Sequence, residues 1–171
     1  MHNITFNRNR IMKNKLELRM YGLVPYNISP IQQGIQYGHA VVDYRESLDG
    51  HKDMLKLYKK WAKKDKTFII LNGGTTNNNK KRLGTLNKHL AALKTNKIKV
   101  QDFYEPDLND ALTGVCFLVD ERVFNREVYP DFIDGDYSKK QLDKRYAKWA
   151  DSIGGPKNVF LRDFLKGFRL A

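Results

Sequence analysis

The chain has 171 residues, of which 41% are hydrophobic, and this is enough to fill the core of one ordinary domain. It carries 31 Lys and Arg against 19 Asp and Glu, a formal net charge of +12 that favours a polyanionic partner such as nucleic acid. The single cysteine, Cys116, excludes an internal disulfide, and no apolar run reaches the roughly 18 residues that a membrane span needs. We therefore expect a cytoplasmic protein without a membrane partner.

The positive charge is concentrated in the first hundred residues. Residues 1–100 carry twenty basic and six acidic side chains, for a net charge of +14, while residues 101–171 carry eleven and thirteen, for −2. A polyanion is therefore expected to contact mainly the first part of the chain. Lysines that only solvate helix faces would give the same composition, and the charge does not separate RNA from DNA.

The start of the chain divides into two segments of different pattern. Residues 1–15 show no apolar periodicity and carry four basic side chains, which predicts a flexible basic arm. From Leu16 to Tyr21 the residues alternate with the two-residue period of a strand, which is predicted to continue to Val24 and to end at Pro25.

A helix is predicted from Pro30 to about Tyr44. Ser29 and Gln32 have the spacing of a Ser-x-x-Gln capping box, and proline suits the first helical position. The predicted buried face of this helix contains Ile31, Ile35, Gly38 and Val42. A polar stripe beside that face contains Gln32, Gln36, His39 and Asp43.

Two further elements follow. Residues 51–64 predict a basic amphipathic helix, with Lys59 and Lys63 among its exposed lysines. The apolar run over residues 67–71 predicts a strand covered on both faces.

A glycine- and asparagine-rich loop comes next and ends in three basic residues, Lys80, Lys81 and Arg82. Thr85 is predicted to cap the helix that follows the loop. The buried stripe of that helix contains Leu86, Leu90 and Leu93. The loop amides and cations can cradle a phosphate, although a solvated surface loop fits the composition equally well. The Walker spacing is absent, which argues against an NTPase.

Two more strands are predicted, over residues 99–104 and 113–119, with an acidic loop between them. Helices are then predicted from Ser138 to about Ile153 and around residues 160–168. This order of elements implies a mixed sheet with helices packed on it. We assign residues 16–120 to a single α/β domain and residues 121–171 to a helical C-terminal extension.

Two groups of side chains are candidates for chemistry. Asp43 lies one turn from His39 and can orient its imidazole as a general base, although a partly buried structural histidine is an alternative. The acidic loop contains Glu105, Asp107 and Asp110. Its carboxylates can activate water, and turn formation explains them equally well. The four scattered histidines offer no zinc-ligand spacing, so neither a metal nor a cofactor is expected.

Two segments of the chain resemble motifs of a known protein family. Residues 29–40 are Ser-Pro-Ile-Gln-Gln-Gly-Ile-Gln-Tyr-Gly-His-Ala, and residues 103–115 are Phe-Tyr-Glu-Pro-Asp-Leu-Asn-Asp-Ala-Leu-Thr-Gly-Val. The first resembles the opening helix of type II peptidyl-tRNA hydrolases, and the second resembles the Glu-Pro-Asp-Leu form of that family's late loop in divergent bacterial and phage relatives. Family enzymes carry a lysine where Gln32 stands.

The resemblance implies a four-stranded mixed sheet flanked by helices, and hydrolysis of the ester that joins a peptide or an amino acid to tRNA. The residues expected to border the ester-binding cleft are Gln32, His39, Glu105 and Asp107. Asp107 or His39 would activate water, and Gln32 would position the carbonyl group. The side chains expected to bind tRNA or another RNA are Lys59, Lys63, Lys80, Lys81 and Arg82.

Two alternatives to ester hydrolysis remain open. Whether the chain forms a homodimer is also open. One is a non-catalytic RNA-binding protein that retains the fold. The other is a protein that captures a small nucleotide, or blocks a partner, through the glycine-rich loop.

Overall fold

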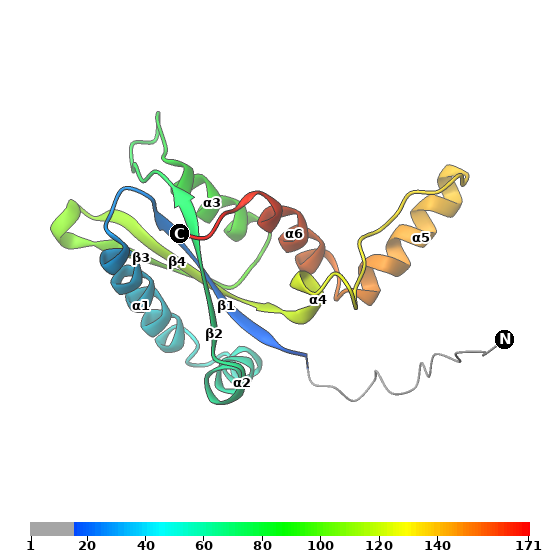
Figure 1. Cartoon of the computed structure of the whole chain (residues 1–171), viewed down its shortest axis with the longest axis horizontal. Coiled ribbons are helices and arrows are strands. Elements are labelled where there is room, and N and C mark those ends of the chain that lie inside the picture. The colour runs from blue at the N-terminus through cyan, green and yellow to red at the C-terminus, as the bar shows by residue number, and fades with distance from the viewer. Residues whose placement is uncertain (1–15) are drawn as a thin grey trace.

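The structure, a computed structural model, describes residues 16–171, so the predicted basic arm over residues 1–15 lies outside the described residues. Four strands form one mixed sheet in the order β2-β1-β4-β3 (Figure 1). The strands are β1 (Leu18–Pro25), β2 (Thr67–Gly74), β3 (Val100–Glu105) and β4 (Ala111–Asp120). β1 and β2 run parallel, whereas β4 pairs antiparallel with both β1 and β3. The prediction of an α/β domain with a four-stranded mixed sheet is confirmed.

Helices cover both faces of this sheet. The helices are α1 (Pro30–Glu46), α2 (Lys52–Lys60), α3 (Thr85–Thr95), α4 (Glu121–Phe124), α5 (Lys139–Ser152) and α6 (Pro156–Phe164). α2 continues into a π-helical turn, Trp61–Asp65. On one face of the sheet α1 and α2 enclose a core, and on the other face α3 and α6 enclose a second core. Within residues 16–171, no helix is both long and apolar enough to cross a membrane.

Successive side chains of β1 point alternately into the two cores. Met20 and Val24 point to the side of α1 and α2, while Tyr21 and Leu23 point to the side of α3 and α6. These four side chains are buried because β1 is an inner strand of the sheet. The alternation predicted for this segment therefore holds, but the strand is covered on both faces.

The buried face of α1 differs from the predicted one. Ile31 is 77% exposed and Val42 is 63% exposed, so the predicted apolar face points to solvent. The residues of α1 that are buried are Gln36, Tyr37, Ala40 and Tyr44. The prediction was wrong because the two large aromatic rings bury more apolar surface than the isoleucines would, and the sheet has space for them.

Two glycines of the sheet provide the space under α1. A Cβ atom on Gly22 of β1 would lie 2.2 Å from the ring of Tyr37, and one on Gly114 of β4 would lie 2.7 Å from the backbone oxygen of Gln36. The hydroxyl of Tyr37 donates a hydrogen bond of 2.7 Å to the backbone oxygen of Met20. Burial raises the pKa of this hydroxyl, so it stays a donor. α1 therefore approaches the sheet through glycines of the strands and not through its own.

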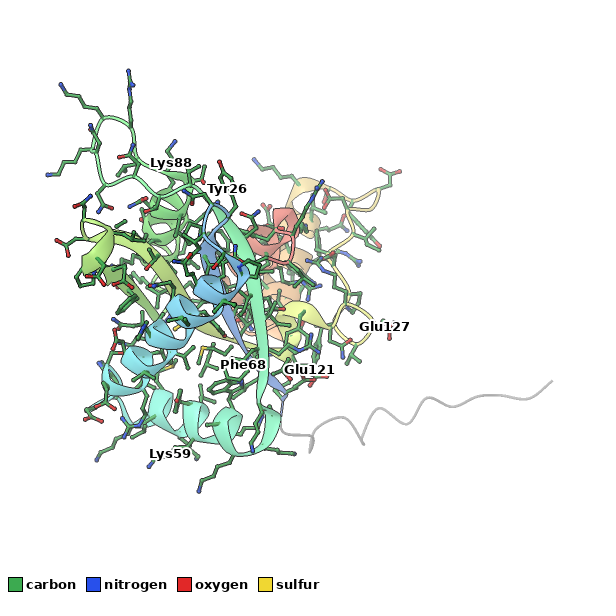
Figure 2. All side chains as sticks on the ribbon, turned by 60° about the vertical axis from the view of Figure 1, so that its left-hand side comes forward. Tyr26, Lys59, Phe68, Lys88, Glu121 and Glu127 are labelled. Atoms are coloured by element: carbon green, nitrogen blue, oxygen red, sulfur yellow. The ribbon has the colours of Figure 1, made fainter. Side chains whose placement is uncertain are left out.

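β2 is an edge strand of the sheet, and its side chains pack into both cores: Ile69 and Leu71 lie on the side of α3 and α6, and Ile70 lies on the side of α1 and α2. The prediction that this strand is covered on both faces is therefore confirmed. Phe68 is 53% exposed and lies between α1 and α2, as Figure 2 shows. Part of the outer edge of β2 is covered by the end of the chain, where Ala171 donates a backbone hydrogen bond to Ile70 and Leu170 pairs with Leu71.

The C-terminal helices have different environments. Leu161 of α6 belongs to the core beside α3, and Phe164 and Phe168 pack against that core. In contrast, α5 projects from the rest of the molecule (Figure 1) and has no buried residue. The last part of the chain therefore completes the sheet domain, while α5 presents its surface to solvent.

Candidate functional site

The start of α1 is fixed by local hydrogen bonds. The backbone N–H of Gln32 donates to the hydroxyl of Ser29, and the side-chain oxygen of Gln32 accepts the backbone N–H of Ser29 at 3.1 Å. This is the predicted capping box. Gln32 is exposed, and with its oxygen held by the cap its Nε2 amide is the group that remains to donate to a ligand.

Gln36, one turn after Gln32, forms the centre of a hydrogen-bonded chain. This residue is only 7% exposed. The hydroxyl of Thr113 on β4 donates to the Oε1 of Gln36 at 2.6 Å, and the Nε2 of Gln36 donates to the Oε2 of Glu105 at 2.6 Å. Thr113 therefore sets which way the amide faces, and the amide in turn positions the carboxylate of Glu105 at the end of β3.

His39 does not form the predicted pair with Asp43. The imidazole stacks on the ring of Phe103 on β3, with 4.7 Å between the ring centroids and 19° between the planes. Among residues 16–171, no hydrogen bond joins His39 to Asp43 or to Glu105. The structure thus places His39 over β3 beside the site but does not orient it as a general base.

The acidic turn, residues 105–110, connects β3 with β4. Pro106–Leu108 form a 3-10 turn, and both Asn109 and Asp110 have positive φ angles, of 54° and 52°. Asn and Asp tolerate this left-handed conformation better than most residues, so turn formation explains their presence. Asp107 is exposed, and its carboxylate has no hydrogen-bond partner within the described part of the chain. Of the two predicted carboxylates, only Glu105 is held in place.

The basic loop, residues 75–84, packs against this turn. The side-chain amide of Asn78 donates to the backbone oxygen of Asp110 at 2.7 Å. The loop itself is held by asparagine side chains: Asn77 accepts the N–H of Asn79, and Asn79 accepts the N–H of Lys81. The three cations of the loop, Lys80, Lys81 and Arg82, are exposed, and the loop that carries them contacts the turn that follows Glu105.

Several backbone amides of the loop are already engaged within the protein. The N–H groups of Thr75 and Gly84 already donate within the loop and the start of α3, as does that of Leu86. Thr85 is the first residue of α3 and not its cap, and its hydroxyl donates to the backbone oxygen of Gly73. Contact with a phosphate is therefore expected mainly from the cationic side chains.

The predicted RNA-binding side chains form two separate groups. Lys59 and Lys63 precede β2, whereas the cations of the basic loop follow it. β2, which is eight residues or about 25 Å long, lies between the two groups along the chain. Figure 2 shows this separation, with Lys59 at one end of the molecule and Lys88, on α3 after the loop, at the other.

The single cysteine has a structural role, and no metal site is formed by the described residues. Cys116 is buried, its thiol donates to the backbone oxygen of Ala40 at 3.2 Å, and burial raises the pKa of the thiol, so it is not a nucleophile. In the region that the structure describes, no three His, Cys, Asp or Glu side chains are grouped so that they can hold a metal ion.

The sequence did not reveal the importance of Gln36 and Thr113. Gln36 was visible as a member of the polar stripe, but its burial depends on Gly114 and its partners come from two distant strands. Comparison of the chain with protein-family models gave no match, and comparison with curated proteins gave none either.

Proposed function

We propose that this protein hydrolyses the ester bond between tRNA and a peptide or an amino acid, with Glu105 as the general base. The hydrogen bond from Gln36 to Glu105 carries the proposal. An ionised carboxylate only accepts hydrogen bonds, and Gln36 occupies Oε2, so Oε1 remains to accept a proton from an attacking water. Glu105 thus replaces Asp107 and His39, which lack a comparable partner, in the role of base.

The positive charge of the basic loop favours a tRNA substrate. Its three cations lie on a segment that touches the acidic turn through Asn78 and Asp110. A phosphate backbone bound there would bring an adjacent nucleotide to the end of the sheet at Glu105. The resemblance of residues 29–40 and 103–115 to type II peptidyl-tRNA hydrolases supports a tRNA ester over other RNA substrates.

Stabilisation of the oxyanion would come from Gln32 and from the start of α1. The Nε2 amide of Gln32 can donate a hydrogen bond, and the helix dipole adds positive potential there. The amide lacks the charge of a lysine, and α1 has no Lys or Arg before Arg45. The lack of a cation at the start of α1 favours the second candidate function, a non-catalytic RNA-binding protein with the same fold.

The test is hydrolysis of N-acetylaminoacyl-tRNA by the purified full-length protein. Glu105→Gln should reduce kcat/KM at least about a hundredfold, because general-base catalysis contributes on that order. Asp107→Asn is the matched control, since it makes the same chemical change in the same turn at a side chain without a partner, and it should change kcat/KM only a few fold. A wild-type protein that binds tRNA without cleaving it would support the non-catalytic candidate, and full activity of Glu105→Gln would contradict the assignment of the base.

A further inference from the structure

The α5 projection, residues 130–152, is a second surface suited to bind a ligand. α5 is 14 residues long, or about 21 Å, and lies on the side of the molecule away from the β3–β4 turn (Figure 1). It carries five cations and two carboxylates. The role of this segment is not explained by the site at Glu105.

The base of the projection is held rigidly by Arg162 of α6. Arg162 is 1% exposed, and it donates to the carboxylate of Asp131 at 2.9 Å and to the backbone oxygen of Tyr129 at 2.7 Å. Arg126 also pairs with Asp131. These bonds fix the segment that enters the projection, so its surface is formed before any ligand binds.

A cluster of three aromatic rings joins α5 to this segment. Phe132, Tyr146 and Trp149 have centroids between 5.2 and 5.7 Å apart. The indole N–H of Trp149 donates to the backbone oxygen of Pro130 at 3.0 Å. These contacts hold Trp149 in place at the surface, where it lines a hollow.

Two hollows lie side by side along one flank of α5. The larger has a volume of about 450 Å³ and is lined by Phe132, Ile133 and Trp149, among others, and Ile133 is 77% exposed. The smaller has a volume of about 280 Å³ and includes Tyr137. Arg145 and Lys148 line both hollows and so stand between them. Each hollow therefore combines aromatic surface with the same pair of cations.

The two cations are available for a ligand. In residues 16–171 neither Arg145 nor Lys148 takes part in an ion pair. The guanidinium of Arg145 lies 4.2 Å from the centroid of the Tyr137 ring, which holds it by a cation–π contact and leaves its N–H donors free of protein acceptors. The carboxylate that lines the larger hollow, Asp131, is already bound by Arg126 and Arg162.

We propose that this flank of α5 binds a single-stranded segment of nucleic acid. A phosphate would lie between Arg145 and Lys148, and the bases on either side of it would enter the two hollows, where they stack on aromatic rings or on the guanidinium of Arg145. An acidic peptide would satisfy the cations but would leave the aromatic surface of the larger hollow unused. The proposal does not depend on ester hydrolysis at Glu105.

The test measures binding of a fluorescein-labelled ten-nucleotide oligouridylate to the full-length protein by anisotropy. Arg145→Glu with Lys148→Glu should weaken binding at least about tenfold, because both the phosphate contact and the base contacts beside it are lost. Lys139→Glu with Lys140→Glu is the matched control, since it makes the same change in charge on the same helix outside the hollows. An equal loss in both double variants would overturn the proposal.

A second measurement reports on the projection alone. The chain has two tryptophans, so Trp61→Phe leaves Trp149 as the only one. Base stacking in the larger hollow should quench its fluorescence in proportion to the bound oligonucleotide, and the quenching should disappear in Arg145→Glu with Lys148→Glu. No quenching, or equal quenching by a polyglutamate peptide of the same length, would overturn the proposal and in the second case identify an acidic protein partner.

Discussion

The Nε2 amide of Gln36 donates a hydrogen bond of 2.6 Å to the Oε2 of Glu105, across the interface between α1 and the end of β3. The interaction depends on a close approach of α1 to the sheet, which Gly114 permits. It also depends on Thr113, whose hydroxyl holds the other end of the amide.

Gly114→Ala should move α1 away from the sheet. The added Cβ would lie 2.7 Å from the backbone oxygen of Gln36, and backbone cannot yield as a flexible side chain can. We expect a loss of about 1–3 kcal/mol in the free energy of unfolding, measured by urea denaturation, together with a loss of ester hydrolysis. Gly38→Ala is the control: its Cβ has nothing within 4 Å and the position is helical, so this change should stabilise the protein by about 0.5–1 kcal/mol. Equal effects of the two changes would contradict the close approach.

Thr113→Val should destabilise the protein although it preserves the shape of the side chain. It leaves the buried Oε1 of Gln36 without its donor, which costs about 1–3 kcal/mol. The matched control is Thr76→Val, because the hydroxyl of Thr76 is buried and has no hydrogen-bond partner among the described residues. That change should be neutral or slightly stabilising by the same measurement. If Thr113→Val were as harmless as Thr76→Val, Thr113 would not hold the amide of Gln36.

The features of the fold that depend on local pattern could be predicted from the sequence. The capping box at Ser29 and Gln32 is formed by residues three apart, so its geometry follows once the helix exists. The leucine stripe of α3 is also as predicted, with Leu86, Leu90 and Leu93 buried. In both cases the residues that interact are close along the chain.

The buried face of α1 and the central role of Gln36 could not be predicted in the same way. Periodicity favoured Ile31, Ile35 and Val42 because it weighs only the residues of the helix itself. Which face is buried is decided by Gly22 and Gly114, on strands that are distant in sequence. The choice between Glu105 and Asp107 likewise depended on which of them Gln36 reaches, and nothing in the acidic turn alone distinguishes them.

The basic loop and the pair Lys59 and Lys63 should contribute to the binding of RNAs of different size. Reversing Lys80 and Lys81 to Glu should weaken binding of a short acceptor-end hairpin and lower the slope of log K against log salt by about 2. Reversing Lys59 and Lys63 makes the same change in charge before the other end of β2, a strand about 25 Å long, so it should affect full-length tRNA and leave the short hairpin nearly unchanged. Binding measured at four salt concentrations checks both. A hairpin that is equally sensitive to the two pairs would show that the basic loop has no special place near the ester.

His89 of α3 packs against the last residues of the chain. Its ring lies 5.6 Å from that of Phe164 and 4.8 Å from that of Phe168, and burial lowers the pKa of the imidazole. In the unfolded chain a histidine titrates near pH 6.5. Above that pH the ring is neutral in both states, so its packing stabilises the fold fully.

As the pH falls below 6.5, the unfolded chain takes up a proton that the folded protein resists, and the free energy of unfolding falls until the pH has passed the lowered pKa. We therefore expect the wild type to lose more stability between pH 8 and pH 5 than His89→Gln, which has no titrating group at this position. Urea denaturation at both pH values gives the comparison, and His51→Gln, at an exposed position before α2, serves as the control. An equal pH dependence of the wild type and His89→Gln would mean that His89 does not link the docking of the C-terminal segment to pH.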